Sequence, residues 1–315
     1  MIIEISFNRY QHNWYVGELY QKFYEYLVEK YGNDSIQFTH MDKLAERFGH
    51  QNNTHSLSIF SIYNLIITNK KTNKTFIHSL SDYAPVMMDD NTGILNFDIA
   101  AFSCSSNLDE NIIQRYSSKY KILPSFYILE HLSDIDFIEQ NKKNVSGINK
   151  TYFNGLCYSE RGIYKNILND NEYFVFKNKS STSDYLSKPD YFSEMSKYNF
   201  GLSLNGAAKI CYRDVEYFGL GILCLREPLN IITKDPLING VHYITLLDDD
   251  IRSKIYIESE YDYINEKITN KINDIINNDY SDIINNSRKW YENNCLPINQ
   301  IKTLEYFLKD CKIID

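Results

Sequence analysis

Short apolar runs that alternate with amphipathic helical segments are the feature that most constrains the fold of this sequence. Ile2–Phe7 and Ile36–Thr39 are predicted to be buried strands, and between them Trp14–Tyr31 carries apolar side chains at helical spacing. The second half repeats the pattern, for example with a predicted strand at Phe200–Leu204 and a predicted helix at Ala208–Leu220. Strands that alternate with helices are typical of a mostly parallel sheet covered by helices. The sequence therefore predicts an α/β protein.

The length of 315 residues is enough for two domains of ordinary size. The polar segment Lys142–Lys150 separates the two alternating series and predicts the boundary between them. We therefore expect an N-terminal Rossmann-like domain over residues 1–146 and a C-terminal one over residues 147–296, facing each other across a cleft. Residues 297–315 are predicted to form a helix that packs back toward the N-terminal domain. Ligands of such domains bind beyond the carboxyl ends of the parallel strands.

The composition narrows the class of protein. With 43% hydrophobic and 15% aromatic residues, the chain has enough apolar side chains for packed cores, which excludes intrinsic disorder. Its net charge of −8 argues against a protein that binds duplex DNA through a basic face. The frequent Asn, Ile, Lys and Tyr residues are typical of AT-rich genomes, such as those of low-GC bacteria, phages or large DNA viruses.

Three features of the sequence predict a cytoplasmic protein, or one that meets membranes only peripherally. No stretch approaches the roughly 20 apolar residues of a membrane span, so no transmembrane segment is expected. The apolar N-terminal run has no basic residues before it, unlike a signal peptide. None of the six cysteines forms a C-x-x-C pair, so they are predicted to be reduced thiols. If the source is viral, the expected location is the host cytoplasm.

The clearest signal for ligand binding follows the strand predicted at Phe200–Leu204. The turn after it contains Asn205, Gly206 and Ala207, whose small side chains let a ligand approach the backbone. The first amide groups of the predicted helix, together with the positive end of its dipole, suit an anion such as a diphosphate. Lys209 is predicted to lie in the first turn of this helix and to add positive charge.

The same helix carries charged side chains that share a face. Arg213 and Glu216 are three residues apart, and Tyr212 and Glu216 are four apart, so these side chains adjoin on a helix. Arg213 can bind phosphate oxygens bidentately, and Glu216 can accept hydrogen bonds from ribose or sugar hydroxyls. The structural alternative is an ion pair between Arg213 and Glu216, which contributes about 0–1 kcal/mol when it is exposed.

The segment YRDVEYFGLGILCL, which begins at Tyr212, resembles the donor-binding motif of GT-B glycosyltransferases. That motif combines a loop of small or polar residues, a helix with Arg and Glu, a Gly near the helix end, and an apolar strand. The resemblance implies a nucleotide-sugar-dependent glycosyltransferase of the Leloir type with the two-domain GT-B fold. It also implies that Arg213 contacts the donor diphosphate and that Glu216 holds the ribose or the sugar.

A second segment, YFNGLCYSERGIYK, lies at the start of the predicted C-terminal domain. Asn154 and Gly155 follow a predicted strand, and Arg161 begins a predicted helix. GT-B enzymes that resemble this arrangement place a basic residue here against the donor phosphates. Arg161, Asn154 and Gly155 are therefore further candidates for donor binding, the structural alternative being a solvated arginine on a first helical turn.

The N-terminal domain is expected to supply any catalytic base. An inverting enzyme needs a carboxylate or a histidine to deprotonate the acceptor hydroxyl. Asp82, in the segment HSLSDYAP that also offers His78, is the preferred candidate, and His12 in the loop after the first strand is the second. A retaining enzyme needs no dedicated base, so the stereochemistry stays open.

No metal and no cofactor other than the donor substrate is expected. Asp248, Asp249 and Asp250 are predicted to form the acidic N-terminus of a helix, where the dipole favours them, and not a Mg²⁺ or Mn²⁺ site. The motifs G-x-G-x-x-G, G-x-x-x-x-G-K-[ST] and G-x-S-x-G are absent. Their absence argues against a dinucleotide dehydrogenase, a P-loop NTPase and an α/β-hydrolase.

The sequence leaves several functions open. The expected activity is transfer of a hexosyl or deoxyhexosyl group to a hydroxyl of a glycan, a lipid-linked sugar or a protein. The alternatives are a phage or viral glycosyltransferase that modifies a DNA base, a non-catalytic module that binds a nucleotide or sugar, and a nucleotide-sugar epimerase of the same fold. The donor, the acceptor, the linkage and the oligomeric state are not determined by the sequence.

Overall fold

The chain forms two compact units, which we describe separately. The first unit comprises Met1–Leu132, Ile231–Pro236 and Asn294–Asp315, and the second comprises Ser133–Asn230 and Leu237–Asn293. The computed structural model describes residues 2–7, 16–39, 64–79, 97–102, 108–125, 133–142, 147–155, 157, 159–178, 186–205 and 209–315.

The first unit is built on a six-stranded sheet of order β2-β1-β3-β4-β5-β6. Strand β3 runs antiparallel to both of its neighbours, β1 and β4, and the other pairs are parallel. Residues 70–74 connect β3 to β4, so these two strands form a hairpin. The strands are β1 Ile3–Ser6, β2 Ile36–Phe38, β3 Asn64–Asn69, β4 Thr75–Ser79, β5 Ile99–Phe102 and β6 Lys121–Ile122.

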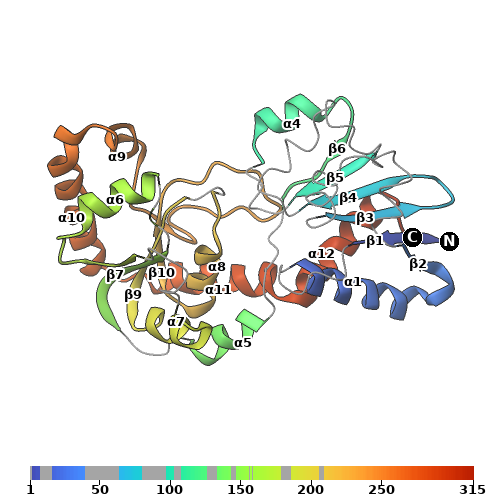
Figure 1. Ribbon diagram of the computed structural model, residues 1–315, viewed down its shortest axis with the longest axis horizontal. Helices are drawn as coiled ribbons and strands as arrows, with labels where there is room; N and C mark the ends of the chain where they lie inside the picture. Colours follow the sequence, from blue (N-terminus) through green and yellow to red (C-terminus); the bar gives the residue numbers. More distant parts are fainter. Residues whose placement is uncertain are drawn as a thin grey trace. The chain divides into compact units, whose positions relative to one another are not determined.

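Helices cover both faces of this sheet. Helices α1 (Val16–Tyr31) and α12 (Pro297–Asp310) lie side by side on one face (Figure 1). Their apolar side chains share a core with the strands that face them. The shorter helix α4 (Glu110–Tyr116) packs on the opposite face. The last helix of the chain thus completes the core of the first unit.

A nearly buried carboxylate, Glu305, ties α12 to α1. It accepts hydrogen bonds from Lys30 Nζ at 2.6 Å, from Tyr26 Oη at 2.5 Å and from Tyr31 Oη at 3.0 Å, and it pairs with Lys309 at 3.3 Å. Burial by itself would raise the pKa of Glu305. The four donors outweigh burial and lower that pKa from 4.5 to about 2.

We expect the network around Glu305 to make the stability of the first unit depend on pH. Because its folded-state pKa is depressed, Glu305 stabilises the fold above about pH 4.5, and this contribution is lost as the pH falls toward about 2. Glu305→Gln should therefore lower the free energy of unfolding by roughly 1–3 kcal/mol at pH 7 and by much less at pH 3. Urea titrations at both pH values test this, with Glu29→Gln on the exposed side of α1 as the control.

The second unit contains an all-parallel five-stranded sheet of order β11-β10-β9-β7-β8. The chain runs from β7 to β8 on one side, crosses back to β9 on the other side of β7, and then continues outward to β10 and β11. The point at which the strand order reverses therefore lies between β7 and β9. The strands are β7 Ile148–Gly155, β8 Phe174–Asn178, β9 Tyr198–Ser203, β10 Leu223–Arg226 and β11 Ile244–Thr245.

Helices also cover both faces of the second sheet. One face packs against α6, α9 and α10 through a shared apolar core. The other face packs against α7 and α8, and α5 in turn packs against these two helices (Figure 1). Helix α11 contacts α8 through Trp290 and Phe218. The helices are α5 Ser133–Gln140, α6 Glu160–Leu168, α7 Lys188–Met195, α8 Tyr212–Leu220, α9 Asp249–Lys254, α10 Tyr261–Ile276 and α11 Ser281–Cys295.

The structure confirms the α/β class and corrects three local predictions. The units divide at Leu132 and not at residue 146, because α5 packs against helices of the second unit. The segment Lys142–Lys150, expected to be a linker, already contains the start of β7. The helix expected from Ala208 begins at Tyr212.

The acidic run Asp248–Asp250 is at a helix N-terminus, as predicted. Asp248 is the N-cap of α9 and accepts a hydrogen bond from the Ile251 amide at 3.0 Å. Lys267 and Lys271 pair with the run at 2.6 and 2.7 Å. Across the described ranges, no three side chains of His, Cys, Asp or Glu gather as metal ligands. No helix in those ranges is long and apolar enough to cross a bilayer.

Candidate functional site

Strands β7 and β9 separate at their carboxyl ends. Their ladder ends at Tyr152 and Gly201, although β7 still pairs with β8 as far as Gly155 and β9 still pairs with β10 as far as Ser203. In doubly wound sheets, a ligand binds at the carboxyl ends of the two strands between which the order reverses. The separation of β7 and β9 is therefore the expected ligand site of this unit.

A buried tyrosine from α8 fills the base of this separation. The Tyr217 hydroxyl lies 3.0 Å from the carbonyl oxygen of Tyr152 on β7 and 3.3 Å from that of Leu202 on β9. A Cβ atom at Gly201 would lie 2.5 Å from the Tyr217 ring, so only glycine admits this ring. The side chain fixes α8 against both strands and so sets the position of the first turn of α8.

Arg213, in that first turn, brings an unpaired positive charge to the site. Its guanidinium carbon lies 4.6 Å from the centre of the Phe153 ring on β7. Its Nε and Nη1 groups are buried and have no hydrogen-bond partner. A Cβ atom at Gly155 would lie 2.4 Å from its Nη2 atom, so glycine at this position admits the guanidinium beside the β7 backbone. The sequence-predicted residues Arg213 and Gly155 are thus brought together.

Arg161 is directed at the backbone. From the first turn of α6 it donates to the carbonyl oxygens of Leu204 and Asn205, both at 3.0 Å, and to Cys211 Sγ at 3.4 Å. These contacts hold the end of β9 against α6. Arg161 therefore positions the Asn205 backbone, whereas the buried Nε and Nη1 groups of Arg213 have no hydrogen-bond partner.

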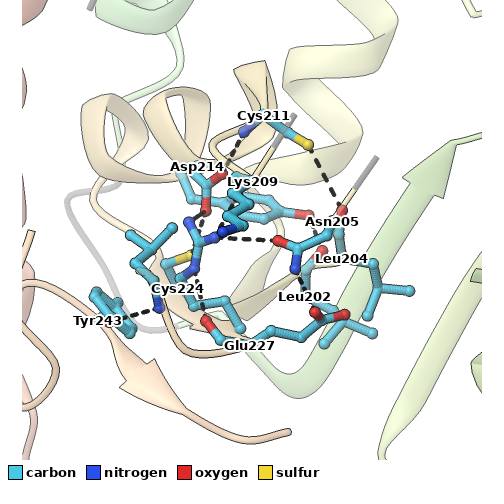
Figure 2. A network of polar contacts seen from close by, with 12 residues as sticks. Leu202, Leu204, Asn205, Lys209, Cys211, Asp214, Cys224, Glu227 and Tyr243 are labelled. Atoms are coloured by element: carbon cyan, nitrogen blue, oxygen red, sulfur yellow. Dashed lines mark hydrogen bonds and ion pairs between the residues drawn. The ribbon is translucent and has the colours of Figure 1, made fainter. Parts of the chain in front are cut away.

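A fully buried ion pair joins α8 to β10 and to Asn205 (Figure 2). Arg226 Nη1 lies 2.5 Å from Asp214 Oδ1, and both side chains are 0% exposed. The other terminal nitrogen of Arg226 donates to the Lys209 carbonyl oxygen at 2.5 Å and to Asn205 Oδ1 at 3.5 Å. The Asn205 amide in turn donates to the buried carboxylate of Glu227.

Sequence reasoning missed Asp214, Arg226 and Glu227. The one available signal was an Arg–Glu pair directly after the apolar strand GILCL, where a charge is expected to need a buried partner. Asp214 also accepts a hydrogen bond from the Cys211 amide at 2.7 Å, so it caps the start of α8. These residues fix the turn and the helix between which the predicted anion site lies.

Glu216 occupies a nearly buried position on α8. It accepts a hydrogen bond from Tyr191 Oη on α7 at 2.6 Å and is 6% exposed. Burial raises its pKa, while the Tyr191 hydrogen bond and the charges of Lys188 and Arg213 oppose that rise. Although both side chains are described, Arg213 and Glu216 do not pair with each other within 4.0 Å.

Among the described residues, the others that the sequence predicts to bind the donor substrate form no hydrogen bond with Arg213. Lys209 precedes α8, so it does not lie in its first turn, and its Nζ donates to the Asn230 carbonyl oxygen at 3.2 Å. Tyr212 is 47% exposed. Asn154 is buried, donates to the Tyr152 hydroxyl at 3.0 Å, and keeps its Oδ1 atom without a partner. The remaining candidates, Gly206, Ala207, His12 and Asp82, lie outside the described residues.

His78, in the segment that contains Asp82, lies in β4. It is fully buried and its Nδ1 atom is 2.6 Å from the Tyr20 hydroxyl. Burial lowers the pKa of His78 to about 3, so its ring is neutral near pH 7. This side chain belongs to the core beneath α1.

Comparison with known proteins finds similarity to solved structures alone. No protein-family model matches the sequence, and no curated protein is significantly similar to it. Among solved structures, the chain is similar to the pneumococcal O-GlcNAc transferase GtfA in complex with UDP and GlcNAc, with a TM-score of 0.44 and 11% sequence identity. The similarity covers 79% of this chain and 50% of that chain, so this chain spans about half the length of that protein.

Proposed function

We propose that this chain is a glycosyltransferase that binds a nucleotide-sugar at the carboxyl edge of the sheet in its second unit. The observation that carries the proposal is the Arg213 guanidinium, which is held at the point where β7 and β9 separate and has two buried N–H groups without acceptors. Each such group costs about 1–3 kcal/mol when it stays unpaired. A diphosphate supplies the missing acceptors and the opposite charge.

The neighbouring residues divide into ligand contacts and supports. Arg213 binds the diphosphate, and Glu216 accepts hydrogen bonds from hydroxyls of the ribose or the sugar. Arg161 and Arg226 hold Asn205 in place through the contacts described above. The guanidinium takes the charge-neutralising role that a metal ion has in other sugar transferases, which is why we propose a metal-independent enzyme. Transfer of a hexosyl or deoxyhexosyl group to a hydroxyl acceptor remains part of this proposal.

Binding measurements with purified protein test the proposal. Isothermal titration calorimetry with UDP, GDP, ADP and CMP, and with their sugar conjugates, should identify one nucleotide that binds without added metal. Incubation with the matching sugar nucleotide should then release the free nucleotide, detected by chromatography, through slow transfer of the sugar to water. Absence of binding to every nucleotide in the panel contradicts the proposal.

Gly155→Ala gives a local test of the Arg213 site. The new methyl group would lie 2.4 Å from Arg213 Nη2, so the flexible guanidinium must move while the backbone does not. We expect nucleotide affinity to fall by roughly tenfold, equivalent to about 1.4 kcal/mol, with little change in the melting temperature.

Gly162→Ala is the matched control for this substitution. A Cβ atom at Gly162, on α6, would meet the Cys157 carbonyl oxygen at 3.4 Å, which is an ordinary contact. This variant should bind the nucleotide as the wild type does. Equal affinities for both variants would show that the ligand does not depend on the position of Arg213.

A further inference from the structure

Helix α7 presents two hydrogen-bond donors, three residues apart, to carboxylates on two other helices. Lys188 Nζ donates to Asp134 Oδ2 on α5 at 2.8 Å, and Tyr191 Oη donates to Glu216 Oε2 on α8 at 2.6 Å. The three helices contact one another on the same side of the sheet (Figure 1). A single helix face therefore holds one oxygen of each carboxylate in place.

Among the described residues, the second oxygen of each carboxylate has no hydrogen-bond donor. Asp134 Oδ1 is buried without a hydrogen-bond partner, and Asp134 as a whole is 6% exposed. Tyr191 donates to Oε2 of Glu216, and within the described ranges no side chain or amide donates to its Oε1. Burying an acceptor in this way is unfavourable by about 1–3 kcal/mol, so a donor is missing at Asp134.

The two carboxylates lie close enough to influence each other. Burial is the main cause of the raised pKa of Glu216, and the charge of Asp134 raises it further. Lys188 and Arg213 lower the same pKa. Two positive and two negative side chains therefore balance in this cluster. A balanced cluster with unused acceptors favours neutral hydroxyl groups as donors over an additional cation.

Unused donors and unused acceptors thus lie in one cluster of the second unit. Arg213 lacks acceptors for two N–H groups, and Asp134 lacks a donor for Oδ1. The charges of both residues affect the pKa of Glu216, since Arg213 lowers it and Asp134 raises it. A single molecule that carries both an anionic group and several hydroxyl groups would complete both sets of hydrogen bonds.

We propose that Asp134 is a specificity-determining residue that, together with Glu216, accepts hydrogen bonds from the sugar hydroxyls of the donor whose diphosphate binds Arg213. This inference rests on the proposed function and adds the residue that distinguishes a sugar nucleotide from the bare nucleotide. Lys188 and Tyr191 act as positioning residues, because each fixes the carboxylate oxygen that faces away from the sugar.

A comparison of two ligands on each variant tests the role of Asp134. The probes are the bare nucleoside diphosphate and its sugar conjugate, taken as the pairs UDP with UDP-glucose, UDP with UDP-N-acetylglucosamine, GDP with GDP-mannose, and ADP with ADP-glucose. For Asp134→Asn we expect the affinity for the bare nucleotide to stay within about twofold of wild type. We expect affinity for the sugar conjugate to fall by roughly 10- to 100-fold, as for a lost hydrogen bond to a charged group.

Two further variants make the result decisive. Asp136→Asn, on the exposed side of the same helix, is the matched control and should bind both ligands as the wild type does. Asp134→Ser gives a second removal of the carboxylate if the asparagine variant does not fold, as judged by thermal melting. Suppose the wild type binds the nucleotide but both Asp134 variants bind its sugar conjugate as the wild type does. The proposed role of Asp134 is then contradicted, whereas the proposed nucleotide site is not. If the wild type binds no nucleotide, both proposals are wrong.

Discussion

Arg213→Met should abolish nucleotide binding while leaving the protein as stable as the wild type or more stable. Two charge-assisted hydrogen bonds to a diphosphate are worth about 1.5–3 kcal/mol each, so the affinity should fall by at least ~100-fold. Removing the guanidinium also removes two buried N–H groups that have no partner in the free protein, a gain of about 1–3 kcal/mol for each. The stacking lost on Phe153 costs about 0.5–2 kcal/mol, which is less than this gain.

The opposite signs of these two effects distinguish a ligand-binding arginine from a structural one. If Arg213 were structural, its substitution would lower the free energy of unfolding of the protein. The molecules that still fold would then bind the nucleotide as the wild type does. Thermal melting and titration calorimetry on one preparation measure both quantities. Arg115→Met is the control, because Arg115 is an exposed residue of α4 whose guanidinium carbon also lies near an aromatic ring, 5.2 Å from the centre of Tyr116. That variant should change neither quantity by much.

Arg213→Lys refines the same prediction. Lysine keeps the positive charge but lacks the planar fork that binds two phosphate oxygens at once. We expect an affinity between those of the wild type and of Arg213→Met. An affinity equal to that of the wild type would indicate that charge alone, and not bidentate geometry, attracts the ligand.

Asp214→Ala should be the most destabilising of the substitutions considered. It leaves Arg226, which is 0% exposed, as an unpaired charge in the core between α8 and β10. Breaking a buried pair by removing one partner costs about 3–5 kcal/mol. Trp290 packs against Phe218 on α8, so its fluorescence during urea unfolding reports on this region. Measurements in a Trp14→Phe background isolate that signal.

Two comparisons show whether the burial of the pair causes this effect. Asp310→Ala removes one partner of the pair with Lys121, whose side chains are 46% and 51% exposed, and should cost no more than about 1 kcal/mol. The double substitution Asp214→Leu and Arg226→Met removes both buried charges and should recover most of the lost stability. If Asp214→Ala lowers the free energy of unfolding by no more than Asp310→Ala does, the described network is contradicted.

The alternation of apolar runs and amphipathic segments was enough to predict the class of fold. Periodicity is a local property, so the strand predicted at Phe200–Leu204 agrees with β9, Tyr198–Ser203, to within two residues at each end. It failed where local signals conflicted with packing. Lys142–Lys150 looks like a linker because it is polar, yet its last residues join β7 in a ladder with β9 that only the folded sheet supplies. Helix α8 begins at Tyr212 and not at Ala208, because Cys211 is its N-cap and the Cys211 amide donates to Asp214.

Sequence by itself determined which side chains are available at the ends of the parallel strands, and it singled out Gly155, Arg213 and Glu216 there. Only the tertiary structure decided their roles. Arg161 and Arg213 both lie in first helical turns, and nothing local distinguishes them. Their difference arises from neighbours distant in the chain, since Arg161 meets the carbonyl groups at the end of β9 whereas Arg213 meets a glycine on β7. Asp134 meets Lys188, 54 residues later in the chain, for the same reason: the order of strands and the packing of helices, which no short-range pattern encodes, set which side chains meet.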